Sequence, residues 1–245
     1  MAVPELIYCA AGGARFAKIA IEAGFTYGAQ LPNTVYFHPE FVDQNWKNPD
    51  LEKYAGAVAQ YQPRLATVLD WERLEQLSAV LDWAETIAAY VETIIIIPKV
   101  VNGISKLPCF VGGKPIRLGY SVPTSFGGTV VPLGEFGRWP VHLLGGSPSE
   151  QFRLSRRLNV ASADGNYCQL MSRYNQYFCP DGSANFAKNR FWPSLRESDG
   201  ARWGDGSDTA DAPYEAFRRS CEAIWAMWHG LPQRRYFAHT RPMFA

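Results

Sequence analysis

The stretch Thr93-Ile94-Ile95-Ile96-Ile97-Pro98 decides the fold class. It carries four isoleucines in a row, without the alternation of apolar and polar residues that a sheet with one wet face shows. A strand of this kind is buried on both faces, as in a parallel sheet covered by helices. The run is far shorter than the roughly 18 to 20 apolar residues that a membrane span needs. We therefore expect a central strand of an α/β protein.

Outward from this run, short apolar runs alternate with longer amphipathic stretches, and the runs end at Gly, Pro, Ser or Asp. Their spacing of about 20 to 35 residues is that of a βα unit. The strands predicted in this way are 6–10, 34–37, 65–69, 93–97, 116–120, 141–144 and 160–163, and the helices are 14–23, 49–60, 71–90, 133–137 and 149–157. Seven such units predict a TIM-type (β/α)8-like barrel, with the eighth strand left open near 176–179.

The composition is that of a folded globular chain. Hydrophobic residues make up 47% and charged residues 19%, which excludes a disordered or coiled-coil protein. Because no linker separates two parts, we interpret 1–245 as one domain with a barrel core over about 5–180. Residues 181–245 are predicted to form a C-terminal extension, with long surface loops over 180–212 and a helix over 214–228.

Charge and cysteine usage limit the classes of function. The 24 basic and 23 acidic side chains leave a formal charge of +1, which excludes a polybasic tail. The N-terminus lacks the basic and apolar regions of a secretory signal, and the five cysteines are scattered. These features predict a cytoplasmic protein with free thiols. The four histidines are too dispersed for a familiar metal spacing, and neither a P-loop nor a dinucleotide-binding glycine motif occurs.

Chemistry in α/β barrels gathers where the strands end, because the loops converge there around the axis. Two predicted strands end directly in a carboxylate, Asp70 and Asp164. Each carboxylate could instead cap the following helix. Gly145-Gly146-Ser147-Pro148 follows another strand, so its backbone N–H groups could bind an anion, or Ser147 and Pro148 could simply begin a helix.

The second half of the chain is rich in arginine. Residues 121–245 hold 14 basic side chains, of which 13 are Arg, interleaved with aromatic residues as at Arg190-Phe191-Trp192. Guanidinium groups and aromatic rings suit phosphates and unstacked bases, although Arg stems also pack on aromatic surface. We expect a nucleic-acid-binding face here, with the candidate residues Arg153, Arg157, Arg173, Lys188 and Arg190.

Three segments together resemble the tRNA-guanine transglycosylase superfamily. They are the strand that ends at Asp70, Val-His-Leu-Leu-Gly-Gly-Ser-Pro at 141–148, and Asn-Val-Ala-Ser-Ala-Asp-Gly-Asn at 159–166. In that family a strand with a Gly-x-Gly-Ser/Thr-Pro-like turn is followed, one helix later, by a strand whose terminal Asp is the nucleophile. The resemblance covers roughly residues 6–170, as strand order and sparse motifs. It implies a barrel that exchanges guanine in nucleic acid for a 7-deazaguanine through a covalent Asp–glycosyl intermediate.

The resemblance implies roles for individual residues. Asp164 would be the nucleophile, and Asp70 would read the guanine-like base. Asp43, upstream of the helix start Asn48-Pro49-Asp50, would be the second catalytic carboxylate. Further substrate-binding candidates are Lys99, near the position of the family's base-contacting Gln, Tyr120, Ser121, Gly145, Gly146 and Asn166.

Departures from the family change the expected substrate. The tRNA enzymes bind zinc through Cys-x-Cys-x-x-Cys and a His after the barrel, whereas only Cys221 and His229 fall in that region here. We therefore expect no zinc and no other cofactor. The segment from Asp43 to Asn48 is also much shorter than in the tRNA enzymes, which favours a reduced, phage-type relative that acts on DNA.

Two alternatives stay open. One is a non-catalytic transglycosylase-like subunit that binds nucleic acid, which a missing second carboxylate near Asp164 would favour. The other is an unrelated barrel enzyme that acts on a small phosphorylated ligand, with Gly145-Gly146-Ser147 as its phosphate-binding site. The partners expected from the resemblance are nucleic acid, DNA rather than tRNA, and a 7-deazaguanine, with no membrane. Members of the family often pair, and the aromatic helix at 217–228 is either core or an interface.

Overall fold

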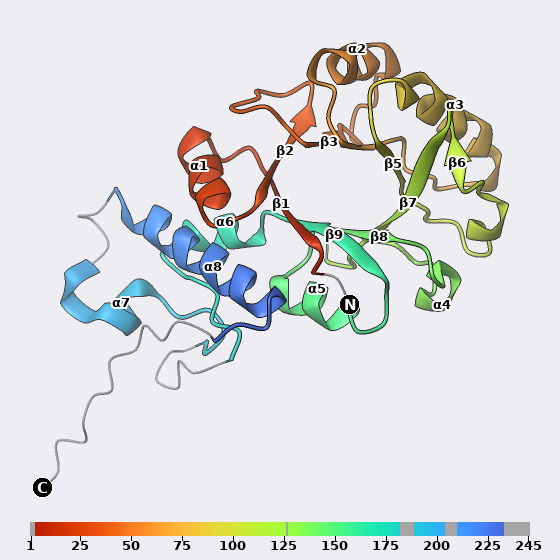
Figure 1. Cartoon of the computed structure of the whole chain (residues 1–245). Coiled ribbons are helices and arrows are strands. Elements are labelled where there is room, and N and C mark those ends of the chain that lie inside the picture. Colours follow the sequence, from red (N-terminus) through yellow and green to blue (C-terminus); the bar gives the residue numbers. More distant parts are fainter. Residues whose placement is uncertain (1–2, 126, 182–188, 204–209, 233–245) are drawn as a thin grey trace, which may run out of the picture.

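A closed barrel of parallel strands forms the centre of the molecule (Figure 1). The computed structural model describes residues 3–125, 127–181, 189–203 and 210–232. Within these residues the barrel strands are β1 (Glu5–Cys9), β2 (Thr26–Leu31), β3 (Phe41–Gln44), β4 (Leu65–Thr67), β5 (Thr93–Ile96), β7 (Lys114–Ser121), β8 (Val141–Leu144) and β9 (Val160–Asp164). Each pairs in parallel with the next, β5 pairs with β7, and β9 pairs with β1. The predicted TIM-type barrel is confirmed.

Helices connect most of the strands and cover the outside of the barrel (Figure 1). They are α1 (Ala14–Glu22), α2 (Leu51–Tyr61), η1 (Leu74–Gln76), α3 (Leu77–Ala88), η2 (Ile104–Lys106), α4 (Leu133–Phe136) and α5 (Pro148–Leu154). The short strand β6 (Phe110–Val111) forms an antiparallel hairpin with β7. The side chain of Asp50 caps α2 by accepting from the backbone N–H of Lys53, and Ser147 caps α5 ahead of Pro148, as the residue types predict.

The strand predictions need two corrections. Residues 34–37 are not a strand, and residues 176–179 form only an isolated bridge between Gln176 and Ser194. The two missing barrel strands are β2 and β3, on either side of 34–37. Their sequences, Thr-Tyr-Gly-Ala-Gln-Leu and Phe-Val-Asp-Gln, are not apolar runs, because the side chains that face the barrel interior include Gly and polar residues.

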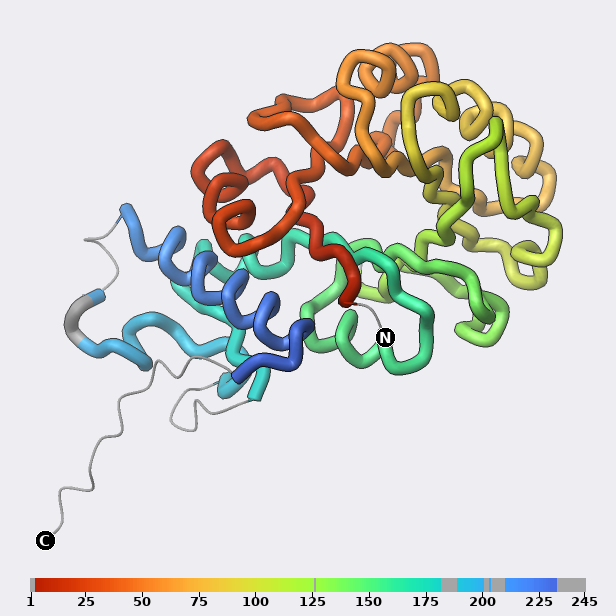
Figure 2. The backbone as a smooth tube through the Cα atoms, viewed as in Figure 1, coloured from red at the N-terminus to blue at the C-terminus, as the bar shows by residue number. Residues whose placement is uncertain are grey.

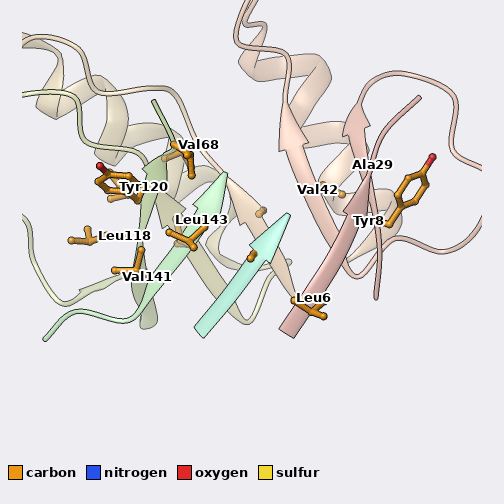
Figure 3. Packing of buried hydrophobic residues seen from close by; sticks show 14 of the residues in the cluster. Leu6, Tyr8, Ala29, Val42, Val68, Leu118, Tyr120, Val141 and Leu143 are labelled. Carbon is orange, nitrogen blue, oxygen red and sulfur yellow. The ribbon is translucent and has the colours of Figure 1, made fainter. Parts of the chain in front are cut away.

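The barrel has an apolar layer on each side of its wall. The outer layer lies between strands and helices and includes Leu6, Tyr8, Leu118, Tyr120, Val141 and Leu143 (Figure 3). A separate cluster inside the barrel consists of Ile7, Phe41, Leu65, Ile95 and Ile97. The isoleucine run thus divides between the layers, with Ile94 and Ile96 outside and Ile95 and Ile97 inside. This explains the absence of alternation in that strand.

The C-terminal region packs on the barrel beside α1, away from α3 (Figure 2). It contains α6 (Tyr167–Ser172), α7 (Leu195–Asp199), η3 (Gly200–Trp203) and α8 (Ala212–Trp228). The Phe217 ring lies 5.4 Å from Tyr8 and 5.1 Å from Phe16, so the apolar face of α8 is part of the core. Residues 180–212 are not only loops, since α7 and η3 fall among them. None of the helices in the described ranges is long and apolar enough to cross a membrane.

Candidate functional site

Two carboxylates point into the barrel near the carboxyl ends of its strands. Asp164 pairs in register with Ile7, and Asp43 follows Phe41 by two residues, so both lie on the side of the strand that faces the interior cluster. Asp164 and Asp43 interact electrostatically, although they come from strands three places apart in the barrel. The second carboxylate that the resemblance implies near Asp164 is therefore present.

Asp43 occupies an environment that favours its protonated form. The hydroxyl of Thr67 donates to Asp43 Oδ1 at 2.7 Å and accepts from the backbone N–H of Gln44 at 2.9 Å. Burial is the main cause that raises the pKa of Asp43 to about 7, and the negative charges of Asp164 and Asp70 raise it further. The hydrogen bond from Thr67 opposes this shift only in part. A carboxyl group of this kind can donate and accept a proton near neutral pH.

Asp164 is held by backbone and side-chain contacts at the ends of β8 and β9. Its Oδ1 accepts from the backbone N–H of Gly145 at 3.2 Å. Gln151 on α5 donates to the backbone carbonyls of Gly145 at 2.7 Å and Asp164 at 2.5 Å, and so ties the two strand ends together. Asn166, not Asp164, stands at the N-cap of α6. The alternative that Asp164 caps the next helix is wrong, because its carboxylate turns into the barrel.

Asp70 forms an ion pair with Lys99 at the ends of β4 and β5. The two strands continue to pair beyond their regular parts through the bridge between Trp71 and Pro98, and Lys99 N–H donates to the Trp71 carbonyl at 2.8 Å. This brings Lys99 Nζ to 2.7 Å from Asp70 Oδ2 and 3.6 Å from Glu72 Oε1. Burial raises the pKa of Asp70, and Lys99 opposes the shift. Arg73, not Asp70, precedes the helical turn η1, so Asp70 is not its cap.

Below Asp164 lies a buried polar group that sequence reasoning missed. His142 on β8 has no exposed surface, and its Nδ1 lies 2.7 Å from Ser162 Oγ while its Nε2 lies 3.6 Å from Asp164 Oδ1. Arg117 on β7 donates to the same Ser162 oxygen at 2.7 Å. The sequence does carry a signal, an ionisable residue inside the apolar strand Val141-His142-Leu143-Leu144. Its meaning becomes clear only when the residues that face it across the sheet are known.

Cys9 is a second residue of the interior that the sequence did not single out. It packs against the interior apolar cluster. Burial raises the pKa of its thiol well above the ordinary value, and the neighbouring charges of Asp164 and Asp43 raise it further. A thiol of this kind stays protonated and is a poor nucleophile.

Tyr120 does not belong to the site, which corrects its predicted role in stacking on the base. It is only 6% exposed, and its ring contacts Phe136 of α4 at 5.2 Å, on the outer side of the barrel (Figure 3). Side chains alternate along β7, so its neighbour Ser121 faces the interior instead. Gly145 and Gly146 lie at the end of β8 with positive φ angles of 65° and 79°, and a Cβ on Gly146 would come within 2.5 Å of Val122. Asn166 is exposed after β9.

The basic candidates that the structure describes lie on different elements. Arg153 is on α5 and pairs with Glu150, and Arg157 precedes β9 at the opposite end from Asp164. Arg173 is exposed at the end of α6, and exposed Arg190 lies over the Phe191 ring at 5.0 Å. Lys188 lies outside the described residues. The predicted nucleic-acid-binding face therefore stays a prediction.

In the part of the chain that the structure describes, no three His, Cys, Asp or Glu side chains are placed to hold a metal ion. Cys221 is buried in the core. His229 stacks on Trp225 with ring centroids 3.7 Å apart, and its Nδ1 lies 2.7 Å from the Trp225 carbonyl. These two residues have structural surroundings and are not arranged as zinc ligands.

The chain belongs to a family of unknown function, DUF6610, whose model matches residues 20–229. The matched part includes Asp43, Asp70, His142 and Asp164. None of the curated proteins matches the sequence. The family assignment leaves the activity open, so the chemistry has to be argued from the site.

Proposed function

We propose that this member of the family is a base-exchange transglycosylase, which replaces guanine in nucleic acid, DNA in preference to tRNA, with a 7-deazaguanine. The observation that supports the proposal is a pair of carboxylates in one barrel mouth with unlike surroundings. Asp164 accepts from a backbone N–H group, whereas burial and neighbouring charge raise the pKa of Asp43 to about 7. Enzymes that act at the anomeric carbon of sugars separate a nucleophile from an acid and base in this way.

In the first step a carboxylate oxygen of Asp164 attacks C1′ of the target nucleotide. The bond between C1′ and N9 of guanine breaks, and its electron pair leaves with the base. Protonated Asp43 supplies the proton that the departing guanine needs. The product is a glycosyl ester on Asp164 and an ionised Asp43.

In the second step the incoming 7-deazaguanine gives its N9 proton to Asp43. Its N9 attacks C1′, the ester bond breaks, and the carboxylate of Asp164 is restored. Asp43 ends protonated, ready for another cycle. The same residue acts as acid and then as base, which a pKa near 7 allows in both directions.

The base would be recognised beside these carboxylates. Asp70 can accept from the N1–H and exocyclic amine of a guanine-like base, and Lys99, which already pairs with Asp70, can donate to O6. The N–H of Gly145 is engaged by Asp164, so Gly146 is the better candidate for a backbone donor to the base. Ser121 is a further donor on the same side of the wall.

Trp46 is better situated than Tyr120 to contact an unpaired base. It follows β3 by two residues, at the same end of the barrel as Asp43, and its side chain is 56% exposed. The ammonium of Lys47 lies 5.3 Å from the ring centroid. Because C1′ cannot be reached in a stacked duplex, the nucleotide must be flipped or unpaired, and exposed aromatic rings stack on such bases.

The other candidate functions have less support. A non-catalytic subunit is disfavoured because Asp43 lies close enough to Asp164 to feel its charge. The loops after β8 and β9 occupy the usual phosphate site of barrel enzymes, which is the observation in favour of a small phosphorylated ligand. However, the Gly145 N–H already binds a carboxylate there, and the charge of Asp164 would repel an anion.

The test is incorporation of radiolabelled guanine into DNA and, in parallel, into tRNA. We expect incorporation into DNA by the wild-type protein, loss of incorporation with Asp164→Asn, and a reduction of about 10²- to 10⁴-fold with Asp43→Asn. Asp82→Asn, which changes an exposed carboxylate on α3, is the matched control and should leave the rate unchanged. Incorporation by Asp164→Asn would contradict the proposal, and binding of nucleic acid without incorporation by the wild type would favour the non-catalytic subunit.

A further inference from the structure

A column of polar side chains rises through the barrel beneath the candidate nucleophile. Arg117, Ser162 and His142 come from the neighbouring strands β7, β9 and β8, and their contacts lead to Asp164. The His142 ring is fully buried and packs on Phe41 with centroids 4.9 Å apart. Polar groups placed so deeply are costly unless each is hydrogen-bonded, so the proton positions are strongly constrained.

The proton positions follow from what each group can donate. Arg117 is only a donor, so it occupies a lone pair of Ser162 Oγ. Among the described contacts of that hydroxyl, only His142 Nδ1 can accept its proton. With a proton on Nδ1, the Ser162 hydroxyl would keep a buried proton without an acceptor, which costs free energy. Neutral His142 therefore carries its proton on Nε2.

The nitrogen Nε2 is buried and has no hydrogen-bond partner among the described residues. Asp164 Oδ1 lies 3.6 Å from it, just beyond hydrogen-bond length, and a small rotation of the carboxylate would close the gap. Catalytic hydrogen bonds are often long before substrate binds. Oδ1 also receives the Gly145 N–H, whereas no hydrogen bond within the described ranges involves Oδ2.

We propose that His142 is a positioning residue: its Nε2–H and the Gly145 N–H together hold Oδ1 of Asp164, and Oδ2 is the oxygen that attacks C1′. The role in attack rests on the proposed function, but the hydrogen-bonded arrangement does not. In the glycosyl ester Oδ2 is bonded to C1′ and Oδ1 is the carbonyl oxygen. When the ester bond breaks, negative charge returns to the carboxylate, and the two donors on Oδ1 stabilise it.

The first test determines the tautomer of His142 by two-bond ¹H–¹⁵N correlation NMR of the full chain labelled with ¹⁵N-histidine. The His142→Gln variant identifies the signals. We expect a proton on Nε2 in the wild type and loss of this preference in Ser162→Ala. Asp164→Ala should move the His142 Nε2 signal, and Asp82→Asn should not. A proton on Nδ1, or a signal indifferent to Asp164→Ala, would overturn the proposal.

The second test measures guanine exchange. His142→Phe keeps the ring but removes the donor, and we expect kcat to fall by about 10- to 100-fold, as for loss of one hydrogen bond to a charged group, with KM for guanine within twofold. His142→Gln can place an amide N–H near Nε2 and should recover most of the loss. Wild-type kcat in His142→Phe, or equal losses in the Phe and Gln variants, would refute the positioning role. If the wild type exchanges no base, the proposed function has failed and the NMR result alone decides the anchoring. If His142→Phe does not fold, the NMR result also decides the anchoring alone.

Discussion

The two sides of the barrel interior differ in what they contribute. The side formed by β3, β4 and β5 is apolar below its carboxyl end, with Phe41, Leu65 and Ile95 packed together. The side formed by β7, β8 and β9 carries Arg117, His142, Ser162 and Asp164. Burial of the first side stabilises the fold, by roughly 1.5 to 3 kcal/mol for each large side chain. The second side gains little stability from its polar groups, because their hydrogen bonds mainly offset the cost of leaving water.

This difference supports the proposal that the polar side serves chemistry. An apolar replacement of similar volume would fill the polar side at least as stably, since buried charged networks are often no better than apolar packing. On the polar side, polar residues continue from Asp164 down into the barrel. On the apolar side, the carboxylates Asp43 and Asp70 lie at the mouth, above apolar residues. Substitutions on the two sides should therefore separate activity from stability.

The largest effect is expected on the polar side. Asp164→Asn should lower the rate of base exchange by about 10⁴-fold or more, since it removes the proposed nucleophile while keeping the size of the side chain. The midpoint of urea unfolding should change little, because the substitution removes a charge that lies close to Asp43. Parallel exchange and unfolding measurements check this. A large drop in stability would show that the polar side is structural.

The next largest effect is expected on the apolar side. Ile95 is fully buried in the interior, and Ile95→Ala should reduce the free energy of unfolding by about 2 to 5 kcal/mol. Ile21→Ala on the exposed part of α1 is the control, and should cost less than about 1 kcal/mol. Urea unfolding measures both. Equal losses for the two variants would break the distinction between the interior and the surface.

Asp43 should make stability depend on pH. Its pKa is raised from 3.8 to about 7 on folding, so between these values the folded state binds more protons than the unfolded state. Stability should thus fall as the pH rises from about 4 to about 7, by an amount on the order of 3 kcal/mol. Asp43→Asn should reduce this slope. Unfolding free energies of both proteins at several pH values test this prediction. An equal slope in the two would show that the pH dependence comes from a group other than Asp43.

The smallest effect is expected for DNA binding, where an aromatic residue at the mouth is compared with one in the outer layer. Trp46→Ala should weaken binding of single-stranded DNA by about 1 to 3 kcal/mol, the contribution of one stacked base. Tyr120→Phe, which changes an outer-layer residue, should leave affinity unchanged. Fluorescence anisotropy at fixed salt compares them. Weakened binding only in the Tyr120 variant would reverse our assignment of the two aromatic residues.

The accuracy of the sequence predictions varied with the surroundings of each strand. Strands with continuous apolar runs, such as 93–97 and 141–144, were predicted correctly because both of their faces are buried. β2 and β3 were missed because their interior faces carry Gly28, Gln30 and Asp43, which interrupt the apolar pattern. The polar residues Gln30 and Asp43, which made these strands hard to predict, belong to the mouth of the barrel.

Sequence alone therefore determined the class of fold, the strands buried on both faces, and Asp70 and Asp164 as strand-end carboxylates. These features are local, since they depend on which residue types follow one another along the chain. Only the tertiary structure decided that Asp43 shares the mouth with Asp164, that Tyr120 faces outward, and that His142 lies beneath Asp164. These relations depend on the register between strands far apart in the sequence, which residue order does not specify.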